Sequence, residues 1–79
     1  MENKEILEKL TPIFQEAFND DELEINESMT SDDFDNWDSV TQMLLVATIE
    51  KEFEIKFKLR ELNTLTSVSA IVSAISSKF

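Results

Sequence analysis

Three segments of this chain carry apolar residues at steps of three and four, and this spacing constrains the fold more than any other feature. The first runs from about residue 3 to residue 18, with Ile6, Leu7, Leu10, Ile13, Phe14, Ala17 and Phe18 on one face. Pro12 lies inside it and lacks a backbone N–H, so we expect a kink there, or a new turn capped by Thr11. The pattern predicts an all-α domain.

The second segment runs from Ser39 to about Phe53 and carries two apolar stripes. One stripe comprises Leu45, Ile49 and Phe53, with Val46 beside them, and the other, roughly opposite, comprises Val40, Leu44 and Ala47. A helix packed on one side only should be polar on its back. The second stripe is therefore either buried by another helix or left open as a docking patch, and Met43, between the stripes, suits both.

The third segment, from Thr66 to Lys78, has Val68, Ile71, Val72 and Ile75 at helical spacing. Thr66 or Ser67 is expected to cap its start, and Lys78 suits its negative end. Its serines (Ser69, Ser73, Ser76 and Ser77) make it a weak helix by intrinsic propensity. We therefore expect this helix to depend on packing.

Two connections separate these helices. Residues 19–38 lack helical periodicity and predict a long loop, held to the bundle by Leu23, Ile25, Met29, Phe34 and Trp37. Residues 53–59 alternate apolar and charged as a strand would, but the chain offers no second strand to pair with them. We therefore expect an extended connector pinned by Ile55 and Phe57, followed by a short helical turn at about 59–63.

Composition narrows the classes of function. The 79 residues suffice for one domain, 1–79, and contain no cysteine, histidine or glycine. This excludes disulfides, thiolate metal sites, P-loops and dinucleotide fingerprints, and it weighs against a self-sufficient enzyme. With no apolar run of membrane-spanning length and an acidic start unlike a signal peptide, we expect a cytoplasmic protein, by default a monomer.

The net charge of −10 is unevenly distributed. Residues 19–38 hold nine acids and no base, whereas residues 51–79 hold five bases and three acids. Such a balance argues against nucleic acid and anionic membranes as partners, because both need basic residues. It favours proteins with basic docking surfaces, found through electrostatic steering.

Ser39 lies where the acidic loop meets the second helix, with Asp38 as a candidate N-cap accepting from the backbone amide of Thr41 or Val40. Three stretches surround or follow it: Trp37-Asp38-Ser39-Val40, Ile49-Glu50-Lys51-Glu52-Phe53-Glu54-Ile55-Lys56-Phe57 and Leu65-Thr66-Ser67-Val68. At this spacing they resemble the acyl carrier protein family over nearly the whole chain. The resemblance implies a bundle of three long helices and one short helix, with the long loop between helices one and two.

The resemblance also implies a function. A phosphopantetheinyl transferase would attach 4′-phosphopantetheine from coenzyme A to Ser39, with Asp38 assisting this Mg²⁺-dependent transfer. The arm would carry acyl or aminoacyl groups as thioesters for enzymes of lipid, fatty acid, polyketide or related biosynthesis. Helix two would be the recognition element, with partner contacts at Asp35, Trp37, Val40, Leu44 and Ala47. A carried chain could lie near Met43, Val46, Ile55, Leu59 and Leu62.

The chain departs from the family pattern at a few positions. Val40 replaces the usual Leu or Met, and Asn36 and Glu54 stand near places where the family has glycine. Leu44 and Ala47 stand where carriers of fatty acid synthesis often show acids, which favours a specialised pathway.

Two alternatives stay open. A small helical interaction domain without a cofactor could use the stripe of Val40, Leu44 and Ala47 to bind a partner helix. A calcium site is suggested by Asp33-x-Asp35-x-Trp37, but an EF-hand loop needs an oxygen ligand and a glycine where Trp37 and Asp38 stand.

Overall fold

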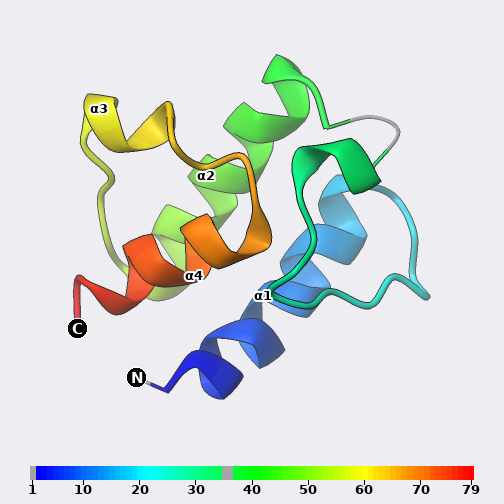
Figure 1. The fold of residues 1–79 in the computed structure, drawn as a ribbon, viewed down its shortest axis with the longest axis horizontal. Helices are drawn as coiled ribbons and strands as arrows, with labels where there is room; N and C mark the ends of the chain where they lie inside the picture. The colour runs from blue at the N-terminus through cyan, green and yellow to red at the C-terminus, as the bar shows by residue number, and fades with distance from the viewer. Residues whose placement is uncertain (1, 35–36) are drawn as a thin grey trace.

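The structure, a computed structural model, describes residues 2–34 and 37–79 and confirms an all-α fold. Its elements are α1 (Asn3–Ala17), a 3₁₀ turn η1 (Ser31–Asp33), α2 (Ser39–Phe53), α3 (Leu59–Leu62) and α4 (Val68–Ser76) (Figure 1). No β-strand occurs in these residues. The bundle of three longer helices, one short helix and a long loop between α1 and α2 is therefore as predicted.

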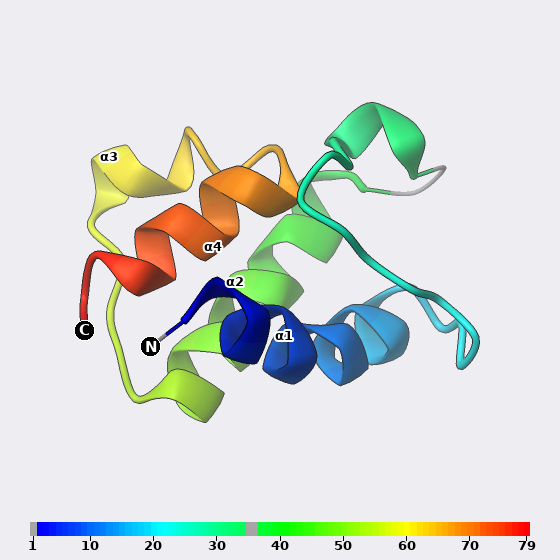
Figure 2. The ribbon, with the colours of Figure 1, turned by 60° about the horizontal axis from the view of Figure 1, so that its bottom comes forward.

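Helix α1 packs against both α2 and α4 (Figure 2). It buries Ile6, Leu10, Ile13 and Phe14, the face that the spacing predicted. The helix continues through Pro12, so the expected new turn capped by Thr11 is wrong. The Thr11 hydroxyl instead donates to the Leu7 carbonyl oxygen at 2.9 Å, within the helix. Packing of this apolar face on two other helices outweighs the one backbone hydrogen bond that proline removes.

The core is built from the apolar faces of α1, α2 and α4, with Leu65 from the segment before α4. Its buried members are Ile6, Leu10, Ile13, Phe14, Leu45, Ile49, Phe53, Leu65, Val68, Ile71, Val72 and Ile75. Within the described residues no polar or charged side chain is buried. Ser67 rather than Thr66 caps α4, because its Oγ accepts from the Ala70 amide at 3.1 Å.

The loop between α1 and α2 is anchored at several points, and the predicted anchors Leu23, Ile25, Met29, Phe34 and Trp37 all pack against the core. Thr30, just before η1, pairs with Ser67, the N-cap of α4, through an isolated β-bridge. The Ser31 amide donates to the Thr66 carbonyl at 2.9 Å, and the Val68 amide donates to the Met29 carbonyl at 2.9 Å. The loop is thus fixed in space before it reaches α2.

The connector between α2 and α3 begins at Glu54, whose left-handed backbone (φ 56°, ψ 46°) ends α2. Ile55 and Phe57 are half-buried, as predicted for an extended connector, and the Phe57 amide donates to Glu50 Oε2 at 2.8 Å. Farther on, Lys78 Nζ lies 3.1 Å from Glu61 Oε1 and over the Phe57 ring. These contacts tie the connector to α2, and α3 to the segment that follows α4.

No helix in residues 2–34 and 37–79 is both long enough and apolar enough to cross a bilayer.

Candidate functional site

Ser39 is the first residue of α2 and is exposed. Its hydroxyl makes no hydrogen bond with any residue that the structure describes. The backbone amides of a first helical turn have no carbonyl partner within the helix, and the helix dipole places partial positive charge there. An exposed hydroxyl at this position can therefore be reached by a second protein and can carry an anionic group.

Asp38 fixes the start of the helix. Its extended backbone and its Oδ1, which accepts from the Thr41 amide at 2.9 Å, make it the N-cap, as predicted. Hydrogen bonds from the Thr41 backbone amide and hydroxyl lower the pKa of the Asp38 carboxyl below its ordinary value of 3.8. The carboxylate therefore stays ionised beside Ser39 at neutral pH.

Trp37, one of the predicted anchors of the loop, packs beside the start of α2. Its ring centroid lies 5.2 Å from that of Phe34, 5.7 Å from that of Phe14 and 5.9 Å from that of Phe18. The indole Nε1 donates a hydrogen bond to Gln42 Oε1 on the first turn of α2. Asp35, the other loop residue expected to contact partners, lies outside the described residues.

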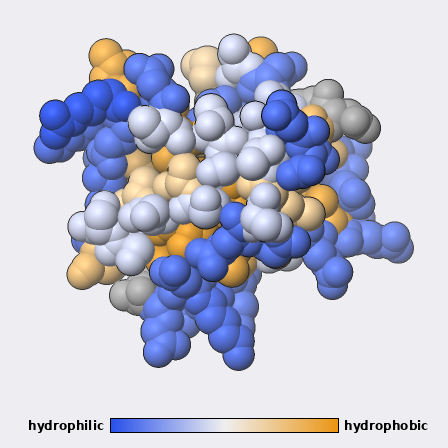
Figure 3. All heavy atoms as spheres, in the orientation of Figure 1, coloured by the Kyte–Doolittle hydropathy of each residue, from blue (hydrophilic) through white to orange (hydrophobic). Residues whose placement is uncertain are grey.

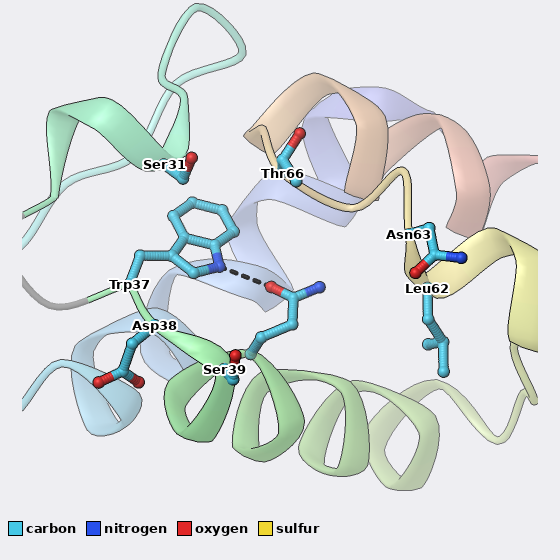
Figure 4. Close-up of a pocket in the computed structure, with 8 residues that line it drawn as sticks. Ser31, Trp37, Asp38, Ser39, Leu62, Asn63 and Thr66 are labelled. Carbon is cyan, nitrogen blue, oxygen red and sulfur yellow. Dashed lines mark hydrogen bonds between the residues drawn. The ribbon is translucent and has the colours of Figure 1, made fainter.

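A groove runs along α2 from Ser39, facing the end of α3 and the segment that follows it (Figure 4). It consists of two hollows of about 440 and 400 Å³ that share Ser39, Gln42, Leu62 and Asn63. The polar lobe, as we call the first hollow, is completed by Ser31, Trp37, Asp38 and Thr66. The apolar lobe, the second hollow, is completed by Met43, Val46, Ala47 and Glu50. Ser39 thus lies where the two lobes meet.

The groove agrees only in part with the residues expected near a carried chain. Met43, Val46 and Leu62 line the apolar lobe, whereas Ile55 and Leu59 do not, and Leu59 is 81% exposed. Leu62, one turn after Leu59 in α3, is the residue of this short helix that lines the groove, and the expectation for Ile55 and Leu59 stays a prediction. Sequence reasoning missed Gln42 and Asn63. Gln42 could have been found, because a residue three positions after Ser39 lies on the same face of a helix.

Among the described residues, no helix covers the second apolar stripe of α2. Val40 is 76% exposed, Met43 72% and Leu44 49%, and Ala47 is also exposed. Of the two alternatives, burial and an open patch, the structure shows the open patch. Figure 3 shows one face of the molecule, on which hydrophobic residues reach the surface between hydrophilic ones.

In the described residues no group of three or more acids is placed to hold a metal ion. The seven acids of the loop within residues 19–34 are all exposed. Asp35, the central acid of the calcium alternative, lies outside the described residues, so this alternative stays a prediction.

Comparison with known proteins agrees with this geometry. The family model described as the phosphopantetheine attachment site matches residues 8–75. The fold is similar to the solution NMR structure of a holo acyl carrier protein from Geobacter metallireducens, with 36% identity over 91% of this chain and 83% of that one and a TM-score of 0.83. No curated protein sequence matches significantly. The chain thus belongs to the acyl carrier protein family, whose covalently bound cofactor is 4′-phosphopantetheine.

Proposed function

We propose that Ser39 carries the 4′-phosphopantetheine arm and that the chain presents acyl or aminoacyl groups to enzymes of lipid, polyketide or related biosynthesis. The observation that carries this proposal is the Ser39 hydroxyl, exposed and without a hydrogen-bond partner among the described residues, at the point where a helix begins and two lobes of a groove meet. The chain acts in this proposal as a carrier and not as a catalyst.

The residues around Ser39 fit such a group. A phosphodiester on its Oγ would lie near the first-turn amides of α2, where negative charge is favoured. In the loading reaction, Ser39 Oγ would form a bond to the phosphorus of the phosphopantetheine half of coenzyme A, and the P–O bond to the nucleotide half would break, releasing adenosine 3′,5′-bisphosphate. The serine proton would pass to a base of the transferase. Asp38, ionised and beside the hydroxyl, supports the Mg²⁺-dependent transfer by offering a carboxylate to the cation.

The arm, when bound, supplies a terminal thiol that carries an acyl group as a thioester. The protein around it must hold the anchor and leave the thioester intact. Because the chain has no cysteine and no histidine, it offers neither a thiolate nor an imidazole to attack that thioester. This composition suits a carrier of reactive thioesters.

Partner enzymes would meet two kinds of surface near Ser39. The exposed acids of residues 19–34 would steer enzymes that have basic docking surfaces, including the phosphopantetheinyl transferase. The open stripe of Val40, Leu44 and Ala47 would then provide apolar contact. Its apolar character supports a specialised pathway rather than primary fatty acid synthesis.

Intact-mass measurement after incubation with coenzyme A, Mg²⁺ and a broad-specificity phosphopantetheinyl transferase tests the proposal. The wild-type chain should gain the mass of one phosphopantetheinyl group, and Ser39→Ala should gain none. Ser31→Ala is the matched control, because Ser31 lines the same groove and should be dispensable. Loading that persists in Ser39→Ala, or that is lost in a folded Ser31→Ala, would overturn the assignment.

A further inference from the structure

The Gln42 side chain has a defined orientation. Trp37 Nε1 donates to Gln42 Oε1, and an indole nitrogen can only donate, so the amide oxygen must face Trp37. The NH₂ group of Gln42 is then on the side of the carboxamide away from the indole, and Gln42 lines both lobes of the groove. It makes no hydrogen bond with any residue in the described part of the chain.

Trp37 is itself held in place. It packs against three phenylalanine rings, Phe14 from α1, Phe18 from the end of α1 and Phe34 from the loop, at centroid distances of 5.2–5.9 Å. A hydrogen bond from so constrained a ring fixes the carboxamide that accepts it. The Gln42 donor is therefore preorganised.

The position of this donor relates it to Ser39. Gln42 lies three residues after Ser39 on α2, and both residues line both lobes of the groove. Asn63 lines the opposite side at the end of α3, with an exposed carboxamide that has no hydrogen-bond partner among the described residues. Gln42 and Asn63 both line both lobes, so a chain attached to Ser39 Oγ has these two amides within the lining of either lobe that it enters.

We propose that the Gln42 NH₂ group donates a hydrogen bond to a carbonyl of the phosphopantetheine arm, so that the arm lies in the groove between α2 and residues 62–66. This proposal rests on attachment at Ser39. The arm is the occupant that fits, because its two amide groups offer carbonyl acceptors and its attachment point is part of the lining. Trp37 acts as a positioning residue for Gln42.

A single hydrogen bond suffices for such a site. A tethered ligand has an effective concentration in the millimolar range, so it needs little further attraction to occupy a neighbouring groove. One net hydrogen bond changes such an equilibrium by about fivefold. Contact this weak holds the arm between encounters and still releases it to a partner enzyme.

NMR of ¹⁵N-labelled protein before and after loading tests the proposal. The chain contains two glutamines, and Gln15 is the internal control, since its Nε2 already donates to the Leu23 carbonyl at 2.9 Å. On conversion from apo to holo, the side-chain NH₂ signals of Gln42 should shift and those of Gln15 should not. If the Ser39 and Val40 backbone signals report loading while the Gln42 NH₂ signals stay in place, this inference is wrong and the attachment at Ser39 stands.

Reactivity of the arm thiol provides the second measurement. Because the chain has no cysteine, a disulfide reagent reports only on the arm. Gln42→Leu, which keeps the bulk of the side chain but lacks the donor, should raise the reaction rate by up to about fivefold. Trp37→Phe, which keeps an aromatic ring but lacks the indole N–H, should raise it less. Rates equal to wild type in both folded variants would overturn the proposal.

Discussion

Leu44 and Leu45 are neighbours in α2 with the same side chain, yet the structure uses them differently. Leu45 is 1% exposed and packs in the core with Ile49 and Phe53, whereas Leu44 is 49% exposed on the stripe with Val40 and Ala47. One face of α2 thus holds the fold together. The other face exposes apolar side chains to solvent beside Ser39. Such exposure lowers solubility and is not needed for folding.

This contrast shows that apolar residues at helical spacing can serve two separate purposes in one helix, packing in the core and exposure at the surface. Within α2, the buried core takes only the face of Leu45, Ile49 and Phe53, which joins the buried residues of α1 and α4, so the second stripe needs a different explanation. Its place around the first turns of α2 supports docking of partner enzymes. Variants on the two faces should therefore separate stability from recognition.

The largest expected difference is in stability. Leu45→Ala leaves a cavity in the core and should lower the free energy of unfolding by about 2–5 kcal/mol. A core of this size supplies only about 3–5 kcal/mol, so this loss removes a large part of the stability of the chain. Leu44→Ala should change the free energy of unfolding by less than about 0.5 kcal/mol. Urea denaturation followed by circular dichroism measures the free energy of unfolding of both variants. Similar losses in the two variants would contradict the difference between the two faces of α2.

The next effect is on recognition. Leu44→Gln keeps helix propensity but removes apolar contact, and it should lower kcat/KM of loading by the transferase by about tenfold. Glu8→Gln, an exposed substitution on α1, is the matched control and should leave that rate unchanged. An unchanged loading rate in Leu44→Gln would show that this transferase does not use the stripe.

A third substitution should change stability without touching the exposed stripe. Glu54 ends α2 in the left-handed region, where a side chain is unfavourable and glycine is not. Glu54→Gly should therefore raise the free energy of unfolding by about 1 kcal/mol and leave the rate of transferase loading at its wild-type value. Thermal and urea unfolding give the first quantity; a loss of stability would mean that Glu54 makes a contact worth more than the backbone strain.

The smallest expected effect concerns the other end of α2. The folded-state pKa of Asp38 is lowered, so its contribution to stability is present above the unfolded value of 3.8 and is lost as pH falls through the folded pKa. The stability difference between wild type and Asp38→Ala should accordingly be largest near neutral pH and shrink in acid. A difference that does not depend on pH would contradict the capping role of the carboxylate.

Local features of this fold could be read from the sequence, and features that depend on distant contacts could not. The start of α2, its cap at Asp38 and the core face of Leu45, Ile49 and Phe53 follow from neighbouring residues. Continuity of α1 through Pro12 depends on its packing against α2 and α4, which no local rule contains.

The groove, too, could not be predicted from the sequence, because it depends on distant contacts. The Trp37–Gln42 hydrogen bond and the placement of Asn63 depend on how the loop before α2 and the connector after it are anchored. Those anchors include the Thr30–Ser67 bridge, which joins residues far apart in the sequence, and the Glu50–Phe57 hydrogen bond. Neither contact has a sequence signature.

The central claim is that the exposed hydroxyl of Ser39 holds the arm, and fragmentation mass spectrometry of the loaded wild-type protein tests it most directly. The account predicts that the added phosphopantetheinyl mass, one per chain, lies on a fragment that contains Ser39 and on none of the fragments that contain the other serines. The same mass found on Ser31 or on a serine of α4 would contradict it.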